Sequence, residues 1–484
     1  MEEHTWNLMA PASGPDGLRD LAGRLAAAGT GDLIVFAHDR HGRWDEPAAV
    51  ERHFGRLLTA GAAPRAEGGV ALLNVRWPSM RFPDERVPAS GHAPPDTVRD
   101  AAPDLSVFPL DDLLALFPGR ADTVYALDDA FRHRRARHTD LDDVGLLLRR
   151  LVALPLGAPG GAAGSDTTGE IVPQSDPAML FDPAVEVCGR FTDFLELMAE
   201  TCEEADTRPS ADNAGPAEQA APEPLLEDRG DPPEVPDTTL REPGTVTSSD
   251  ELDADRGRHS VPHLWDGAYE LLRQVTYHAL RRRAAVLGRE RLAAGVRTLR
   301  AAAPGTRVHL VGHGMGARLA AHALTEVRTE RDPAPVASLT LLQAAVSHHV
   351  FAPSIPWQLR GRGRLHDVVE AVAGPLVVGH SGHDLLLGLM FPQATKMTGD
   401  AAGHTTPDRR WGALGFDGAQ GVDGGPELTL ATALRAGLPE SGIVNVDTSA
   451  VVRRGGPPNP GHDDIWHEDV ARLVLTAAGL AGPA

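Results

Sequence analysis

Residues 308–319, Val-His-Leu-Val-Gly-His-Gly-Met-Gly-Ala-Arg-Leu, constrain the fold of this chain more than any other segment. An apolar run breaks into three alternate glycines, Gly312, Gly314 and Gly316, and residues that favour a helix follow. This pattern predicts a buried strand, a sharp turn and a helix. Glycines are expected at the two outer positions because a bulkier side chain would clash with the turn, and the small Ala317 lets the helix pack closely.

The spacing matches the Gly-x-Ser-x-Gly nucleophile elbow, a turn that presents a serine hydroxyl above the edge of a sheet. The serine position of that motif is Gly314 here, which has no side chain and therefore no nucleophile. Glycine adopts the left-handed backbone of such a turn without a Cβ clash, whereas an ordinary residue there costs on the order of 1–3 kcal/mol. We therefore expect the turn to persist and nucleophilic attack from this position to be lost.

Other apolar runs predict the remaining architecture. Strands are expected at 33–37, 70–75, 308–311, 338–342, 375–378 and 443–446. Helical spacing of apolar residues is found at 47–60, 110–118, 140–153, 178–202, 265–283, 286–303, 315–328 and 468–480. Strands that alternate with helices predict a mostly parallel sheet flanked by helices, which is the α/β class.

The strand series pauses in the middle of the chain, and this sets the expected domain organisation. Residues 1–100 and 261–484 would form the two parts of one core, and 101–203 a lid-like helical insertion. Within the insertion, 156–170 are rich in Gly, Ala, Ser and Thr and are expected to be flexible. Residues 204–260 are acidic and rich in proline with few large apolar side chains, so we expect a disordered linker.

Composition excludes several classes of protein. The formal charge of −21 argues against a nucleic-acid surface, which needs clustered positive charge. Lys396 is the single lysine, so neither a P-loop nor a protein kinase site can be assembled. The acidic start has no apolar core of a signal peptide, and no run of about 18 apolar residues predicts a membrane span. Two cysteines, Cys188 and Cys202, do not predict a disulfide framework, and we expect a cytoplasmic protein.

Two candidates for the partners of a nucleophile follow later strands in the order acid, then histidine. Asp384 follows the run at 375–378, and His462 follows the run at 443–446, just before the last helix. His467 competes with His462 but stands at the start of that helix. Asp463 and Asp464 could serve as N-cap groups for it.

The carboxyl ends of the first and third runs supply the other candidates. The backbone N–H of Met315 would be one oxyanion donor, and the loop that begins with His38 and Asp39 would supply the second. His313 lies inside the turn itself. We therefore expect these residues to border an oxyanion or ligand-binding site.

Three segments resemble actinobacterial α/β-hydrolase-like proteins, which carry V-R-W-P-S after the second strand, a G-H-S-x-G-A-R-L elbow and a terminal G-A-H-S-D-I segment. The corresponding residues are Val75–Ser79, Gly312–Leu319 and Gly461–Ile465, and Ser338–Ala345 also matches. The resemblance implies an α/β-hydrolase-like fold with the elbow serine at Gly314, the acid at Asp384 and the base at His462. It implies a fold more than a reaction, because substrates of such proteins are poorly defined.

These observations leave several functions open. The first is a pseudohydrolase without a cofactor that binds or scaffolds an unknown small-molecule or protein ligand. The alternative is an active esterase-like or peptidase-like hydrolase with a relocated nucleophile, for which Ser381 is the candidate, or with a histidine-rich metal site.

The histidines expected near the carboxyl edge of the sheet are His38, His41, His313, His348, His349, His380, His383 and His462. No metal-ligand spacing supports them, since His309 and His313 lie roughly 13 Å apart on a strand. The acidic linker could also bind a basic partner.

Overall fold

The computed structural model describes 14 stretches of the chain. They are residues 1–9, 15–40, 46–63, 69–83, 85, 107–134, 137–153, 166–167, 177–207, 260–357, 360–398, 409–422, 425–454 and 461–482. The side chains of Pro15, 46–50, Ala178, 197–207, 396–398 and Arg409 are not described. The linker predicted at 204–260 lies outside these residues, apart from the end of one helix and Ser260. The division into four segments remains a prediction.

Eight strands form one sheet in the order β1-β3-β2-β4-β5-β6-β8-β7, and every neighbouring pair is parallel. The strands are β1 (Glu2–Asn7), β2 (Thr30–Ala37), β3 (Gly69–Arg76), β4 (Arg307–His313), β5 (Ser338–Leu342), β6 (Pro375–His380), β7 (Glu427–Thr429) and β8 (Gly442–Asp447). From β2 the chain crosses to β3 on one side, and from β4 it crosses to β5 on the other. A sheet whose crossovers diverge in this way opens a crevice at the carboxyl ends of the two strands, here β2 and β4.

Helices cover both faces of the sheet. The α-helices are α1 (Pro15–Ala27), α2 (Glu46–Gly61), α3 (Leu110–Leu116), α4 (Ala121–His133), α5 (His138–Val152), α6 (Ala184–Thr207), α8 (Val261–Leu287), α9 (Ala293–Ala302), α10 (Gly314–Val327), α11 (Phe391–Thr398), α12 (Leu414–Asp417), α13 (Leu430–Ala436) and α14 (Glu468–Ala477). Short 3₁₀ or π turns are η3 (Pro118–Arg120), η5 (Ala178–Phe181), η7 (Gly288–Leu292), η8 (Val369–Ala371), η9 (Leu386–Met390) and η10 (Arg409–Trp411). No helix in these described stretches is long and apolar enough to cross a membrane.

Side chains alternate along β2 and so define the two layers. Leu33 and Val35 pack into the larger core, with residues of α1, α8, α9 and α10. Ile34 and Phe36 pack into a second core on the other face, with residues of α2 and α14. Phe36 and Phe54 of α2 approach with ring centroids 4.5 Å apart. The sheet is therefore buried on both sides, as a parallel sheet requires.

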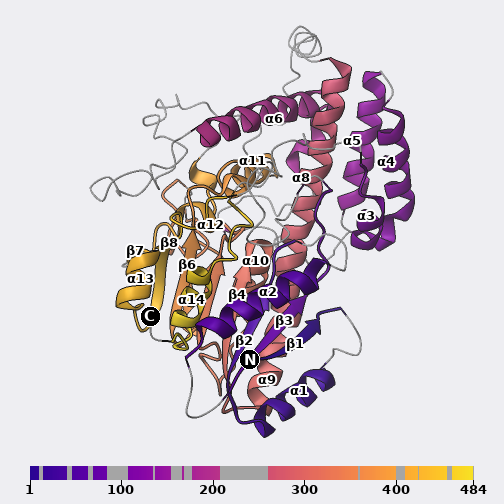
Figure 1. Ribbon diagram of the computed structural model, residues 1–484. Coiled ribbons are helices and arrows are strands. Elements are labelled where there is room, and N and C mark those ends of the chain that lie inside the picture. The colour runs from indigo at the N-terminus through magenta and orange to yellow at the C-terminus, as the bar shows by residue number, and fades with distance from the viewer. Residues whose placement is uncertain are drawn as a thin grey trace.

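The insertion gathers around the upper half of α8 in Figure 1, where α3, α4, α5 and α6 lie away from both chain termini. Helices α5 and α6 pack directly on α8. Gly267 on α8 faces α6 so closely that a Cβ there would lie 2.0 Å from the carbonyl oxygen of Cys188. Helix α8 thus contacts both the insertion and α10, which belongs to the layer that covers the sheet.

All six predicted strands are present, and the mostly parallel α/β fold is confirmed. One expectation within the insertion was wrong. Asp166, inside the segment expected to be flexible, is buried and contacts Arg318 and Arg281. Arg281 of α8 is only 5% exposed, and Asp166 is its buried carboxylate partner.

Candidate active site

The turn between β4 and α10 is as tight as the glycines predicted. Helix α10 starts at Gly314, whose φ of +53° is left-handed and suits glycine. A Cβ on Gly316 would lie 2.1 Å from the carbonyl oxygen of Ala37, and a Cβ on Gly312 would lie 2.4 Å from the Cα of Ala317. Glycine is therefore required on both sides of Gly314 by close backbone approach, to β2 in one case and to the helix itself in the other.

The carboxylate of Asp39 fills the space in front of Gly314. A Cβ on Gly314 would lie 2.2 Å from Asp39 Oδ1, 2.4 Å from its Cγ and 2.9 Å from its Cβ. Oδ1 also accepts a 2.7 Å hydrogen bond from the backbone N–H of Met315, the second residue of α10. A carboxylate at the start of a helix is stabilised by the unpaired N–H groups and the helix dipole. Asp39 therefore lies where a side chain at position 314 would enter.

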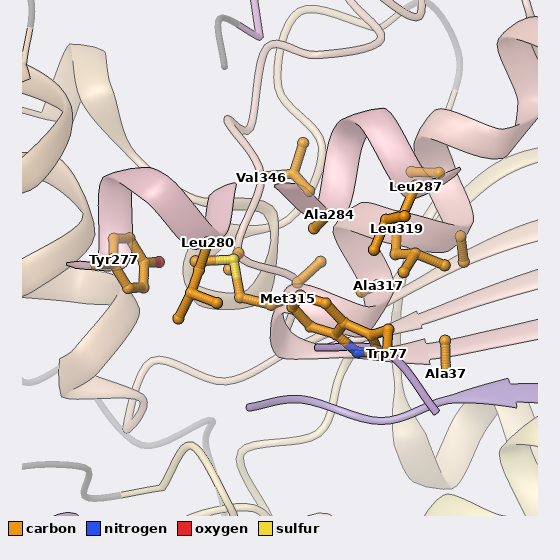
Figure 2. Packing of buried hydrophobic residues seen from close by; sticks show 14 of the residues in the cluster. Ala37, Trp77, Tyr277, Leu280, Ala284, Leu287, Met315, Ala317, Leu319 and Val346 are labelled. Carbon is orange, nitrogen blue, oxygen red and sulfur yellow. The ribbon is translucent and has the colours of Figure 1, made fainter. Parts of the chain in front are cut away.

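Met315 itself is fixed by packing. Its side chain is fully buried, and Figure 2 shows it between Leu280 on α8 and Trp77, which follows β3. The indole N–H of Trp77 donates to the carbonyl oxygen of His38 at 3.1 Å, which ties the loop after β2 to the end of β3. Both partners of the Met315–Asp39 hydrogen bond are thus held by neighbouring elements.

His462 and Asp384 meet, although 78 residues separate them in the chain. His462 Nδ1 donates a 2.8 Å hydrogen bond to Asp384 Oδ2, and Asp384 Oδ1 accepts one of 3.0 Å from the N–H of Leu387. The other ring nitrogen, Nε2, lies 3.4 Å from Asp39 Oδ2. His462 therefore stands between two carboxylates, and all three side chains are at most 3% exposed.

This arrangement fixes the charges at the site. Burial by itself would lower the pKa of His462, but Asp384 and then Asp39 outweigh it and raise that pKa to about 10. Burial would raise the pKa of Asp39, yet its interactions with His462 and Arg40 hold it well below the ordinary value. For Asp384 burial dominates and raises the pKa. At neutral pH His462 therefore carries a proton and cannot act as a general base.

Two arginines that the sequence analysis did not single out enclose Asp39. Arg40 Nε and Arg81 Nη2 lie 3.6 Å and 3.7 Å from Asp39 Oδ2. Arg81 also binds Asp463 through two hydrogen bonds, one of them 2.9 Å long, and Arg40 binds Glu85 at 2.8 Å. Arg81 and Asp463 lie 382 positions apart, and no local pattern links them. The guanidinium groups of Arg40 and Arg81 therefore place positive charge beside the carboxylate of Asp39.

The expectation that Asp463 or Asp464 caps the last helix was wrong. Asp463 faces Arg81, and Asp464 accepts the backbone N–H groups of Arg453 and Arg454. The N-cap residue of α14 is His467, which makes no side-chain capping bond. His467 Nε2 instead contacts Asp464 at 3.0 Å.

The neighbouring histidines are buried and neutral. His313 Nε2 donates to the carbonyl oxygen of His462 at 2.9 Å, and burial together with the charge of His462 lowers its pKa to about 4. His38 contacts the carbonyl oxygen of Asp39, and burial lowers its pKa to about 3. They therefore border the site through backbone contacts, whereas His41 lies outside the described residues. The loop after β2 offers an acceptor, Asp39, where a second oxyanion donor was expected.

The side chains of Ser381, His348 and His380 bond other partners instead of this cluster. Ser381 is fully buried, and its hydroxyl donates to the carbonyl oxygen of Val452 at 2.6 Å. His348 and His380 contact Asp417 and Glu427, at 2.9 Å and 2.7 Å. Within the stretches that the structure describes, no group of three or more His, Cys, Asp or Glu residues could hold a metal ion.

A small cavity adjoins the cluster beside Arg40, with about the room of one water molecule. It is lined by Arg40, Glu85, Arg273, Gln274, Tyr277, Leu386 and Met390. Glu85 pairs with both arginines, at 2.8 Å to Arg40 and 2.9 Å to Arg273 of α8. Helix α8, on which α5 and α6 of the insertion pack, therefore borders the site.

In comparison with known proteins, the segment that contains the turn is similar to a described family. Residues 268–364, from α8 to the segment after β5, match the model of a family described as alpha/beta hydrolase of unknown function (DUF900). No curated protein and no solved structure matches the chain. The match includes Gly314 but neither Asp39, Asp384 nor His462. Together, the parallel sheet and this match support an α/β-hydrolase-like fold.

Proposed function

We propose that this chain is a pseudohydrolase: an α/β-hydrolase-like protein that does not perform serine-type hydrolysis and serves in binding or scaffolding. The observation that carries the proposal is the carboxylate of Asp39 in front of Gly314, bonded to the N–H of Met315. The same carboxylate lies 3.4 Å from Nε2 of His462. The Asp39 carboxylate thus lies where a nucleophilic side chain at position 314 would enter. It also takes up the N–H that would bind an oxyanion, and it faces the histidine nitrogen that would accept a proton.

Each requirement of acyl hydrolysis is missing for a physical reason. Position 314 has no hydroxyl to attack a carbonyl carbon. The N–H of Met315 already binds a charged acceptor, and a developing oxyanion would have to displace it. His462 holds a proton at neutral pH, so it cannot accept one from a nucleophile. Loss of the serine alone typically removes a factor of about 10⁶ in turnover.

The ligand would be a small molecule or another protein. A net charge of −21 disfavours nucleic acid, and two cysteines in 484 residues fit our proposal of a cytoplasmic protein. The helical insertion, which packs on α8 beside the site, is the part we propose to act as a lid.

An assay of the purified full chain tests the proposal. We expect p-nitrophenyl acetate and butyrate to be hydrolysed no faster by the wild type than by His462→Ala, and a fluorophosphonate probe to leave both unlabelled. Turnover by the wild type that disappears in His462→Ala would refute the proposal. Labelling that disappears in Ser381→Ala would instead favour a relocated serine nucleophile.

One observation favours a second candidate, a hydrolase whose nucleophile is the Asp39 carboxylate. Its Oδ1 is held by Met315, while Oδ2 has no hydrogen-bond partner among the described residues. Oδ2 would attack an epoxide carbon to form an ester as the carbon–oxygen bond breaks, the epoxide oxygen would take the proton of His462, and water would hydrolyse the ester. Mass spectrometry after incubation with styrene oxide tests this, because only such a site gains the mass of the epoxide on Asp39.

A further inference from the structure

We propose that the chain retains a latent acyl-hydrolase site, which Asp39 holds closed and which would accept small acyl esters. The proposal rests on the proposed function, because it assumes that the wild-type site is silent. It states further that silence has two separable causes, the missing hydroxyl at position 314 and the carboxylate in front of it. Removing both, and neither alone, should produce an ester-cleaving site.

The rest of the machinery is in place around Gly314. Asp384 orients His462 through the 2.8 Å bond to Nδ1, so that Nε2 points toward Asp39 in front of the turn. The N–H of Met315 points at the same place, since it bonds Asp39 Oδ1 at 2.7 Å. A donor for an oxyanion and a base for a hydroxyl therefore converge on the position that a side chain at 314 would reach.

Steric conflict explains why serine at position 314 is insufficient. A Cβ there would lie 2.2 Å from Asp39 Oδ1 and 2.9 Å from its Cβ. The carboxylate cannot swing aside freely, because Met315, His462, Arg40 and Arg81 hold it within 2.7 to 3.7 Å. Asp39 must therefore be shortened to glycine, since alanine would keep the 2.9 Å contact.

The charge of Asp39 is a second reason why serine at position 314 is insufficient. Asp39 is one of the two carboxylates that keep His462 protonated. Its removal leaves Asp384 as the neighbour that a catalytic histidine needs for orientation, and the pKa of His462 should fall toward its ordinary range. A neutral Nε2 could then take the proton of a serine hydroxyl.

The chemistry that the variant should perform is a two-step acyl transfer. The hydroxyl introduced by Gly314→Ser gives its proton to His462 Nε2, and its oxygen bonds the acyl carbon of p-nitrophenyl acetate. The bond to the leaving group breaks, His462 passes its proton to the departing p-nitrophenolate, and an acetyl ester remains on the protein. Water, deprotonated by His462, then attacks this ester and releases acetate, with the proton returned to the serine oxygen.

Four variants of the full chain test the proposal: Gly314→Ser, Asp39→Gly, Asp39→Gly/Gly314→Ser and Asp39→Asn/Gly314→Ser. We expect the glycine–serine pair to be labelled by a fluorophosphonate about 100-fold faster than the other three, since histidine base assistance contributes at least roughly this factor. The Asn variant is the matched control, because it removes the charge and keeps the steric block. Adding His462→Ala to the glycine–serine pair should abolish the gain.

Two results would overturn the proposal. One is a Gly314→Ser variant that reacts as fast as the pair, which would show that Asp39 blocks nothing. The other is a pair that folds, with a wild-type circular dichroism spectrum, and still remains unlabelled. Esterase turnover by the wild type, by contrast, would refute the proposed function itself and so is distinguishable from both.

A second measurement decides the matter if the double variant does not fold. In Asp39→Asn, with position 314 unchanged, imidazole NMR should show the pKa of His462 lower than in the wild type by about one to three units. An unchanged pKa would overturn the proposal, because Asp39 would then not hold the base in its protonated form.

Discussion

Gly314 and Asp39 are complementary residues. A side chain at position 314 would meet the carboxylate within 2.2 Å, so the pair can exist only with glycine at that position or with Asp39 moved. Two contacts stabilise the carboxylate in this position, because it accepts the N–H of Met315 and faces the charged His462. A glycine in this turn therefore does more than delete a hydroxyl, since it admits a second acid to the site.

Gly316 offers a residue-scale prediction that does not depend on any function. Gly316→Ala places a Cβ 2.1 Å from the carbonyl oxygen of Ala37 and 2.2 Å from that of His38, and backbone atoms cannot move aside cheaply. We expect a loss of about 1–3 kcal/mol in the free energy of unfolding, measured by urea denaturation.

The matched control is Gly23→Ala, inside α1, where an added Cβ meets nothing within 4 Å. There we expect a gain of roughly 0.5–1 kcal/mol, because alanine favours the helix over glycine. Equal effects of the two substitutions would contradict the close approach of α10 to the end of β2.

How far the sequence predicts single residues depends on what positions them. Asp384 and His462 follow successive predicted strands, and parallel strands bring their carboxyl ends to one edge, so their meeting was foreseeable. The role of Asp39 could not be foreseen. Whether the loop after β2 presents a backbone N–H donor or the carboxylate of Asp39 depends on the local conformation of the loop, which the sequence does not specify. The pairing of Arg81 with Asp463 depends on tertiary structure alone.

At the scale of elements, a short segment of the insertion is fastened beneath α10. Asp166 Oδ1 lies 2.6 Å from Arg318 Nη1 on α10, and its Oδ2 lies 3.2 Å from Arg281 on α8 and accepts the N–H of Ser347 at 2.9 Å. The backbone oxygen of Asp166 accepts the N–H of Arg364. One carboxylate thus joins two helices and the loop after β5.

Asp166→Ala should therefore be strongly destabilising. Arg318 is fully buried and would lose its carboxylate partner, so we expect a loss of about 3–5 kcal/mol on urea denaturation. The control, Asp182→Ala, removes the more exposed partner of Arg190 and should change stability by about 1 kcal/mol or less. Similar small effects of both substitutions would show that Asp166 does not fasten the insertion.

Some strands and ordered segments can be predicted from the sequence, and others cannot. The six interior strands are continuous apolar runs, which a sheet buried on both faces requires. The edge strands escaped prediction because β1 buries only Trp6 among its six residues and β7 has three residues, none of them buried. Asp166 escaped because two ordered residues lie within a segment whose composition indicates flexibility, and only their buried partners reveal them.

For the molecule as a whole, the divergent crossovers of β2 and β4 explain why the site lies where it does. Residues after β2 and β4, such as Asp39 and Met315, meet across the crevice, and the later loops add Asp384 and His462. The site is closed by ionised groups with partners, so its charge state is part of the folding free energy. The stability of the protein should therefore depend on pH on both sides of neutrality.

Below pH 6.5 the buried neutral histidines dominate. Burial is the main cause that lowers their pKa from 6.5 to about 3 or 4, so the unfolded chain binds more protons than the folded chain as the pH falls. Stability should then decrease by up to roughly 1.4 kcal/mol per pH unit for each of them. These histidines are His38, His278, His313 and His322.

Above pH 6.5 His462 reverses the sign. Its pKa is raised to about 10, so the folded chain keeps a proton that the unfolded chain releases, and stability should decrease as the pH rises from 6.5 toward 10. The effect of His462 can be measured alone only up to about pH 9. Above that, the buried thiol of Cys188, whose pKa burial raises from 9.0 to about 12, adds a further loss of stability.

Thermal unfolding at constant ionic strength should give the highest midpoint near pH 6.5. In His462→Gln the decline between pH 6.5 and 9 should become shallower, because His380, whose pKa Glu427 raises against the effect of burial, still contributes, while the acidic decline remains. A wild-type midpoint that stays constant from pH 6.5 to 9 would show that His462 is not held as a cation between Asp384 and Asp39.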